Sequence, residues 1–473
     1  MLSSANTAAA EQPELALPGP VRALAERLGK DEAALPAYVY DLDGLAAHVA
    51  AIRAALPRPL ELCYAVKANP DPEVLRVVAR HADSLEVASA GELRHAAATA
   101  PGAVLAFGGP GKTPAELAEA VRVGTFRFHV ESPHELRLLG AAARAAGRIA
   151  DVLLRVNLPD HPAGPVPTPT RPRTETMAPT TKPAATAKDV PAVGATPAAQ
   201  PGPPAVPSLV MGGQPTPFGM DQAQLGQCAE WLAGGGREAS AIRLRGIHAH
   251  LASGLEPPEL LDSARRVLEF ARPWCAAHRV SDPEFNLGGG MAVDYHRPAA
   301  RFDWAEYGRG LAELARPGET LRVEPGRAVT AYCGWYVTRV LDVKQSHRKA
   351  FAVVAGGTHH LRTPAAKGHS QPFTILPVAA WPHDWARPAA RDEPVTIAGQ
   401  LCTPKDVLAR EVAVTVLRAG DLVAFGLAGA YAWNISHLDF LMHPRPGFHY
   451  LRETEHETER AGNEPSGANE MTS

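Results

Sequence analysis

Cysteine is scarce in this sequence, and the few that occur show no pairing pattern. The 473 residues include five cysteines, at positions 63, 228, 275, 333 and 402, and no two of them have the CxxC spacing. An odd and sparse set of this kind argues against a disulfide framework and against a zinc site. We therefore expect reduced thiols, no metal centre and a cytoplasmic location.

Long hydrophobic runs and an excess of one charge are also missing. No apolar run approaches the roughly 20 residues that span a bilayer. The first 20 residues have neither the basic head nor the apolar stretch of a signal peptide, so no secretion signal is expected. The net charge of −3 gives no reason to expect nucleic acid or an anionic membrane as a partner. Apolar residues make up 45% of the chain, which indicates a globular protein.

Strand and helix patterns alternate through the first two thirds of the chain. Helical patterns, such as those at 71–81 and 133–146, separate short apolar runs. The strands are expected at 60–66, 84–87, 104–107, 127–130, 152–156, 244–250 and 284–287. Alternation of this kind predicts a parallel sheet. Seven or eight such units, with polar residues or glycine at the strand ends, favour a closed (β/α)8 TIM-like barrel over an open doubly wound sheet.

The composition divides the chain into five parts. Residues 1–36 read as a tail with a short helix, and residues 37–310 as the barrel. Residues 160–213 interrupt the barrel with a Pro/Ala/Thr-rich tract that has little to bury, so we expect a disordered surface insertion. A partner-binding polyproline segment is the alternative. Residues 311–452 form a C-terminal β-domain, and residues 453–473 a polar, disordered tail.

The β-domain is predicted from β-branched runs separated by turn residues. These runs lie at 321–323, 332–343, 350–354, 395–397, 411–416 and 422–425. The strand near Tyr38 precedes the first barrel helix and could join this domain.

Lys67 is the most informative residue of the chain. The apolar run Leu62–Val66 ends at this lysine, and the turn 69–72 follows at once. Burial at a strand end lowers the pKa of a lysine, and such a lysine can form a Schiff base. The alternative is a lysine that extends its amine from the strand end into solvent.

Three further strand ends carry residues suited to a flat ring or an anion. His248 and His250 are two apart and share a face, so an imidazole could pack on an aromatic ring, or either could be a bonded core histidine. The triplet Gly288–Gly290 could cradle an anion with its N–H groups, or be a flexible turn. Glu324 and Arg327 could hold a pyridinium nitrogen and an anion, or form a salt-bridged turn.

Two residues of the β-domain could also carry chemistry. Cys402 lies in a loop bounded by glycine and proline, where a thiol could donate a proton or act as a nucleophile. Burial as a small apolar side chain is the alternative. Tyr431 follows Gly429 and Ala430, whose small size would let the phenol approach a ligand, although a packed tyrosine is also consistent.

In this order, the motifs resemble the fold-type III pyridoxal-phosphate decarboxylases, the group of ornithine, arginine and diaminopimelate decarboxylases. The resemblance runs from about Tyr38 to about Pro444, without the Pro-rich insertion. It rests on YAVKANP, EVASAGEL (86–93), GPGK (109–112), HVESPHEL (129–136), FGM, GIHAHLASG, NLGGG, EPGR, GQLCTPKDVLA and GAYAWNISHLDF. It implies a TIM-like barrel with an alanine-racemase-like β-domain, pyridoxal 5'-phosphate as cofactor, and amino-acid decarboxylation through an external aldimine and a quinonoid.

The resemblance also assigns roles. Lys67 matches the lysine of the internal aldimine, His250 the imidazole that stacks on the ring, and Glu324 the acid beside the pyridine nitrogen. The phosphate-binding set is matched by Ser253, Gly288, Gly289, Gly290, Arg327 and Tyr431. Cys402 matches the thiol that protonates the α-carbon. In the family this thiol comes from the partner subunit, which implies a homodimer with shared active sites.

Two alternatives to a decarboxylase are a racemase or epimerase and a catalytically inactive regulatory homologue. A protonated pyridine ring is a full electron sink, and Glu324 supports that state. Alanine-racemase-like sites instead place an arginine at this nitrogen, so Glu324 argues against racemisation. Inactive homologues typically lose the lysine, the phosphate ligands or the thiol, and all are present here.

The substrate end of the site departs from the diamine-forming enzymes. Ala355 and Thr403 stand where those enzymes carry acids that bind a distal ammonium, and an unpaired buried ammonium is costly. GGTHH, LCTP and SHLDF look more like the branch that acts on conjugated amino acids, such as siderophore intermediates of the citryl-diaminopropionate type or carrier-bound aminoacyl groups. The candidate substrate residues are Thr403, Asp406, His359 and His360. His359, His360 and Arg362 could meet an acidic distal portion, or have a structural role.

Overall fold

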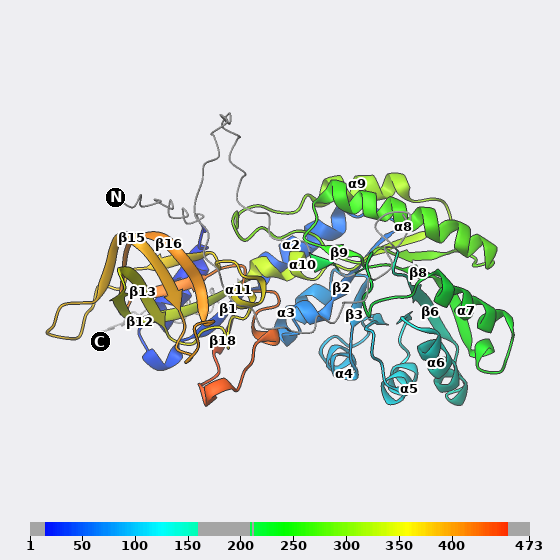
Figure 1. Cartoon of the computed structure of the whole chain (residues 1–473), viewed down its shortest axis with the longest axis horizontal. Coiled ribbons are helices and arrows are strands. Elements are labelled where there is room, and N and C mark those ends of the chain that lie inside the picture. The colour runs from blue at the N-terminus through cyan, green and yellow to red at the C-terminus, as the bar shows by residue number, and fades with distance from the viewer. Residues whose placement is uncertain (1–14, 159–208, 211, 453–473) are drawn as a thin grey trace, which may run out of the picture.

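The computed structural model describes residues 15–158, 209–210 and 212–452. The expected tail from 453 lies outside the described residues, as do most of the expected insertion and the first 14 residues of the N-terminal tail. Figure 1 shows two domains side by side, with a barrel inside a ring of helices on the right and a second sheet on the left. No helix in the described ranges is long and apolar enough to cross a membrane.

Eight parallel strands close into the predicted barrel, in the order β10-β11-β2-β3-β4-β5-β6-β8. The strands are β2 (Leu60–Ala65), β3 (Ser84–Val87), β4 (Leu105–Phe107), β5 (Arg127–Val130), β6 (Ala150–Arg155), β8 (Ile242–His248), β10 (Glu284–Asn286) and β11 (Thr320–Val323). The helices of this domain are α2 (Leu42–Ala54), α3 (Pro72–Ala79), α4 (Ala90–Thr99), α5 (Pro114–Val123), α6 (Pro133–Ala145), α7 (Gln222–Ala233), α8 (Pro257–Ala277) and α9 (Trp304–Leu314). The closed barrel is therefore confirmed.

One barrel strand was assigned to the wrong domain. The run 321–323 was expected in the β-domain, but it lies in β11, where Leu321 pairs in parallel with Phe285 on one side and Leu60 on the other. The barrel therefore extends beyond the expected boundary at residue 310. A short β-branched run looks the same in either kind of sheet, and only its pairing partners decide between them.

Side chains at the strand ends start the barrel helices. Asp71, Ser89, Thr113 and Ser132 each accept a hydrogen bond from an N–H group of the first turn of α3, α4, α5 and α6 respectively. Such caps satisfy N–H groups that have no partner within the helix. Each strand therefore passes into its helix through a short turn, which keeps the carboxyl ends of the strands together at one mouth.

The second domain is a mostly antiparallel sheet. Its path is β14-β17-β12-β13-β15-β16, with β1 paired to β12 and β18 paired to the other side of β1. The strands are β1 (Ala37–Asp41), β12 (Gly334–Ser346), β13 (Lys349–Val354), β14 (Phe373–Leu376), β15 (Ala389–Ala398), β16 (Val407–Arg418), β17 (Leu422–Phe425) and β18 (Gly447–Leu451), with helices α1 (Gly19–Leu28), α10 (Arg327–Thr330) and α11 (Thr363–Lys367). Tyr38 pairs with Tyr336, so the strand near Tyr38 joins this sheet rather than the barrel.

The end of the expected insertion has regular structure. Strand β7 (Leu209–Val210) pairs antiparallel with β9 (Ala252–Ser253). The Gly212 N–H then donates to the Leu251 carbonyl at 2.8 Å, and the Gly213 N–H donates to Asn157 at 2.7 Å. The prediction of disorder up to residue 213 is therefore wrong for these residues, because the apolar Leu209 and Val210 end the Pro/Ala/Thr-rich tract and pair with β9.

A buried charge network joins the strands near their amino ends. Arg127 donates to Glu284 at 2.6 Å, and Arg322 donates to the same carboxylate at 3.3 Å. Arg322 also donates to Glu61 at 3.0 Å. Buried charges are tolerated only when they are paired, so this shared carboxylate is a strong constraint on how the strands meet.

We expect Glu284→Leu to lower the free energy of unfolding by about 3 kcal/mol, because two buried guanidinium groups lose their shared partner. Urea unfolding followed by circular dichroism measures the change. Asp262→Leu is the matched control, because the Arg265–Asp262 ion pair is exposed, and it should cost less than about 1 kcal/mol. Equal losses in the two variants would contradict the account.

Candidate active site

The carboxyl ends of the barrel strands bring the chemically important side chains to one mouth, as is usual for active sites of this architecture. Lys67 follows β2, and Glu324 follows β11. Between them around the barrel lie Glu86 in β3, His129 in β5, His250 after β8 and the glycine triplet after β10. Residues far apart in the sequence are therefore neighbours because the barrel is closed.

Lys67 is held by an acid on the next strand. Its Nζ donates to Glu86 Oε2 at 2.8 Å; the glutamate side chain is buried, whereas that of the lysine is 47% exposed. Burial opposes the charge on Lys67, but Glu86, Tyr431 and Glu324 together raise its pKa above the ordinary value. Burial lowers the pKa of Lys67 as predicted, but the predicted net lowering is wrong, because the acidic neighbours outweigh burial.

Glu86 is a site residue that was not predicted from the sequence. It belongs to the motif EVASAGEL and is the one acid in the strand Ser84–Val87. A single acid in an otherwise uncharged strand was the sequence feature that could have identified Glu86 as a site residue. Its function depends on the pairing of β2 with β3, which places Ala65 opposite Glu86.

The glycine triplet fits closely between its neighbours. The Gly289 N–H donates to His250 Nδ1 at 2.9 Å. A Cβ atom added to Gly289 would lie 2.2 Å from the Glu324 carbonyl oxygen, and one added to Gly290 would lie 2.3 Å from the Ala252 carbonyl oxygen and 3.2 Å from Ser253 Cα. Only glycine fits at these positions. The triplet therefore lies against both the His250–Ser253 turn and the Glu324 segment.

His250 is neutral in this setting. Burial, with the charges of Arg155 and Lys67, lowers its pKa to about 3. A neutral imidazole keeps a flat apolar face that can pack on an aromatic ring.

Arg327 and Tyr431 meet at the junction of the two domains. Arg327 donates to the Tyr295 hydroxyl at 2.7 Å, and its guanidinium carbon lies 4.6 Å from the centre of the Tyr431 ring. The Tyr431 N–H donates to the Ala68 carbonyl at 2.7 Å, one residue after Lys67. The structure therefore brings together all the residues predicted to bind the cofactor. Tyr295 was not predicted, because no motif marked it.

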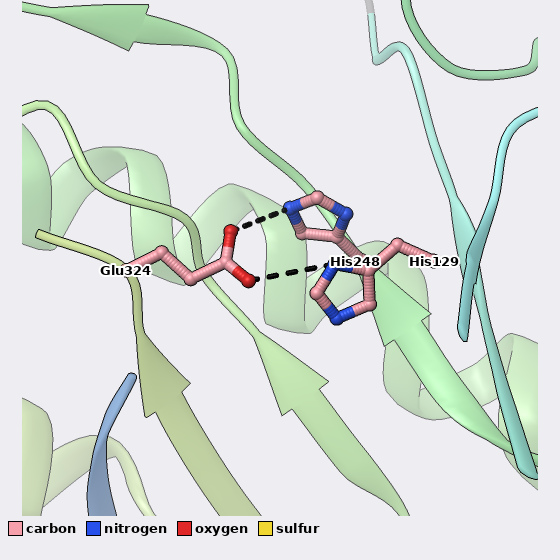
Figure 2. A group of neighbouring side chains, drawn as sticks. All are labelled: His129, His248 and Glu324. Atoms are coloured by element: carbon pink, nitrogen blue, oxygen red, sulfur yellow. Dashed lines mark ion pairs between the residues drawn. The ribbon is translucent and has the colours of Figure 1, made fainter. Parts of the chain in front are cut away.

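Glu324 lies in a buried cluster with His129 from β5 and His248 from β8 (Figure 2). Its Oε1 lies 3.4 Å from His129 Nδ1, and its Oε2 lies 3.3 Å from His248 Nε2. Asn286 Nδ2 donates to Oε1 at 2.6 Å. Burial alone would raise the pKa of Glu324, but His129, His248 and Lys67 hold it well below the ordinary value. Glu324 is therefore a carboxylate, whereas His129 and Asn286 are site residues that the sequence did not reveal.

The loop that carries Cys402 belongs to the second domain. Cys402 is exposed. In the described part of the chain, no hydrogen bond or ion pair joins this loop to Lys67. Asp406 is buried and accepts from the Thr358 N–H at 2.6 Å and the Leu401 N–H at 2.8 Å. Asp406, a predicted substrate residue, therefore fastens the loop to residues 356–358, and Thr403 lies beside Cys402 within it.

The predicted substrate histidines are buried in the same domain. His360 Nδ1 lies 3.1 Å from the Tyr336 hydroxyl. Both ring nitrogens of His359 lack a hydrogen-bond partner among the described residues. The His359 ring lies 5.2 Å from that of His443 and 6.5 Å from that of His437. Arg362 lies 2.8 Å from His437, so one guanidinium and three imidazoles cluster near the Cys402 loop. Burial lowers the pKa of His359 to about 4, so Arg362 is the cation of this cluster.

The mouth fits pyridoxal 5'-phosphate, a flat ring with a phosphate, an aldehyde and a basic nitrogen. Arg327 and the close backbone of the glycine triplet suit a phosphate, although the N–H groups of Gly288 and Gly289 already donate to Asn286 and His250. Lys67 suits an aldehyde once its ammonium has lost a proton, and the buried Glu324 carboxylate suits a protonated ring nitrogen. These groups surround the neutral ring of His250.

Comparisons with known proteins agree with this assignment. The family model described as "Pyridoxal-dependent decarboxylase, C-terminal sheet domain" matches residues 37–429. A 2-[(L-alanin-3-ylcarbamoyl)methyl]-2-hydroxybutanedioate decarboxylase of Staphylococcus aureus is 35% identical over 422 residues, which are 88% of this chain and 94% of that protein. An L-glutamyl-[BtrI acyl-carrier protein] decarboxylase of Niallia circulans is 29% identical over 426 residues, 87% of each chain.

Solved structures confirm the fold. Diaminopimelate decarboxylase from Helicobacter pylori, complexed with L-lysine, superposes with a TM-score of 0.68 over 90% of this chain and 97% of that chain. The two sequences are 20% identical, so this likeness concerns the architecture alone.

The predicted family, fold, cofactor and enzyme class are thereby confirmed. The relatives give no support to the racemase alternative. The chain is an enzyme that uses pyridoxal 5'-phosphate to decarboxylate an amino-acid-derived substrate, and it belongs to the pyridoxal-dependent decarboxylases of the ornithine, diaminopimelate and arginine group.

Proposed function

We propose that the substrate is an amino acid conjugated to an acidic group, such as a siderophore precursor of the citrate-conjugate type. The observation that carries this proposal is the charge around the Cys402 loop. Residues 355–363 contain no acid, and the one acid of residues 399–406, Asp406, is buried and bonded to backbone groups. A distal ammonium would find no free carboxylate there, whereas His359 and Arg362 suit distal carboxylates.

The Staphylococcus aureus relative supports this substrate class. The compound in its name is an alanine unit joined through an amide to a hydroxy-dicarboxylate. Such a molecule presents an α-amino acid to the cofactor and carboxylates at its far end. We place the far end near His359, whose two ring nitrogens have no partner among the described residues.

The side chains at the mouth divide the work of catalysis. Pyridoxal 5'-phosphate supplies, when bound, the electron sink for the breaking carbon–carboxylate bond. Lys67 holds the aldehyde carbon, and Glu324 keeps the ring nitrogen protonated. His250 packs on the ring face. The phosphate is held by Ser253, Gly288, Gly289, Gly290, Arg327 and Tyr431.

The proton for the α-carbon comes from the Cys402 thiol. Because no hydrogen bond or ion pair joins the Cys402 loop to Lys67 among the described residues, we propose a homodimer in which each copy supplies this loop to the mouth of the other. A cytoplasmic location is part of the proposal, because Cys402 must remain a free thiol.

Gly289→Ala should weaken cofactor binding by about 100-fold, because its Cβ atom would collide with the backbone of the Glu324 segment. Absorbance of the bound cofactor during titration measures the affinity. Gly226→Ala, where a Cβ atom meets nothing within 4 Å, is the control and should bind normally. Unchanged cofactor affinity in Gly289→Ala would show that the triplet does not bind the phosphate.

The substrate proposal is tested by carbon dioxide release. The citrate amide of 2,3-diaminopropionate should exceed ornithine, lysine and diaminopimelate by about 100-fold in kcat/KM. His359→Ala and Arg362→Ala should raise KM for the conjugate, whereas Arg391→Ala, an exposed change on β15, should not. A preference for a free basic amino acid would reject the proposal.

Shared active sites are tested by mixing two inactive variants. Lys67→Ala and Cys402→Ala should each be inactive, but their co-expression should restore about a quarter of wild-type activity, because half of the dimers would contain one intact site. Co-expression of Lys67→Ala with Lys67→Ala/Cys402→Ala is the control and should stay inactive. A mixture as inactive as its parents would show that the sites are not shared.

A further inference from the structure

The hydrogen bonds around Glu324 form a chain that begins at the glycine triplet. The Gly288 N–H donates to Asn286 Oδ1 at 3.0 Å, which fixes the orientation of that amide. The Asn286 Nδ2 group then faces two acceptors. One is Glu324 Oε1, at 2.6 Å, and the other is His129 Nε2, at 3.4 Å.

This chain determines which nitrogen of His129 carries the proton. Burial, with His248 and the charge of Arg322, lowers the pKa of His129 well below its ordinary value, so the ring is neutral and has one N–H. Because Nε2 faces a donor, it acts as the acceptor and the hydrogen lies on Nδ1. His129 Nδ1 lies 3.4 Å from Glu324 Oε1, close enough for attraction to the carboxylate but without the geometry of a full hydrogen bond.

His248 approaches the other oxygen of the same carboxylate. Its Nε2 lies 3.3 Å from Glu324 Oε2. Figure 2 shows the two imidazole rings next to each other, with ring centres 4.3 Å apart, and both face the carboxylate. A carboxylate has about four acceptor sites. Asn286 donates to one of them, and the imidazoles of His129 and His248 lie within 3.4 Å of the two oxygens. The carboxylate therefore keeps an acceptor site for the ring nitrogen of the cofactor.

We propose that His129 and His248 are positioning residues that hold Glu324 ionised and oriented, and thereby keep the ring nitrogen of the cofactor protonated. The inference rests on the proposed role of Glu324. It is independent of the proposed substrate. Hydrogen bonds to the charged form of an acid favour that form, and neutral donors supply them without cancelling its charge.

A divalent metal is the competing occupant of this cluster, because the ligand atoms of the three side chains lie within 4.8 Å of one another. A metal would need a lone pair at His129 Nδ1, where the hydrogen-bond chain places a hydrogen. It would also take up the carboxylate that faces the cofactor. The proposed network therefore excludes a metal at the same position.

The test is nitrogen NMR of the holoenzyme reconstituted with cofactor that is 15N-labelled in its ring. The wild type should show the shift of a pyridinium nitrogen. His129→Leu/His248→Met should move the shift to that of a neutral pyridine and lower kcat by about 100-fold, with KM little changed. His95→Leu is the control, because His95 bonds to the Pro70 carbonyl and lies outside the cluster.

Conservative variants separate positioning from packing. An asparagine at 129 places an amide nitrogen near the position of Nδ1, and a glutamine at 248 places one near the position of Nε2. His129→Asn and His248→Gln should therefore keep the pyridinium shift and most of kcat. If the double variant does not fold, the single variants His129→Ser and His248→Ser are measured instead. Each should also move the nitrogen shift towards that of a neutral pyridine.

Three results would overturn the inference or its basis. A pyridinium shift that persists in folded His129→Leu/His248→Met, while Glu324→Gln loses it, would overturn the role of the histidines alone. A shift that persists in Glu324→Gln would remove the proposed role of Glu324. One metal ion per wild-type chain, lost in His129→Leu, would assign the cluster to a metal.

Discussion

Closure of the eight parallel strands is the constraint on which the site depends. Strand β11 lies between β10 and β2, and this position places Glu324 beside both the glycine triplet and the strand that carries Lys67. Backbone bonds fix the arrangement on each side: the Glu324 N–H donates to the Gly288 carbonyl at 2.8 Å, and the Ala65 N–H donates to the Pro325 carbonyl at 3.1 Å. A different partner for β11 would separate the acid from the lysine, although neither residue would change.

Buried carboxylates at the two ends of the barrel have different partners. Near the amino ends, Glu284 is paired with the guanidinium groups of Arg127 and Arg322, so its charge is largely neutralised and its role is structural. At the mouth, Glu324 accepts from the Asn286 amide and lies beside the imidazoles of His129 and His248, and in the described part of the chain no guanidinium pairs with it. Its negative charge is therefore available to a bound ring nitrogen. Lys67 pairs with Glu86 rather than with Glu324. The lysine and the acid proposed to face the ring nitrogen therefore have different hydrogen-bond partners.

The sequence predicted what depends on local pattern and failed where pairing across the barrel decides. Alternation of strands and helices predicted the barrel, and the strand-end motifs predicted a cofactor set that the structure brings together. The same pattern could not place the run 321–323, because its neighbours β10 and β2 are distant in the sequence. Glu86, His129, Asn286 and Tyr295 were missed for the same reason, since their roles come from residues on other strands or loops. The pKa of Lys67 was predicted in the wrong direction because its acidic neighbours were unknown.

The central claim is that this mouth removes the α-carboxylate of an amino-acid conjugate and replaces it with a proton. Turnover of the citrate amide of 2,3-diaminopropionate in deuterated water, with carbon dioxide and product both quantified, tests this claim most directly. The account predicts equal amounts of carbon dioxide and amine, with one solvent deuterium at the former α-carbon. A product that keeps its carboxylate and only loses optical activity, or no turnover by protein loaded with cofactor, would contradict it.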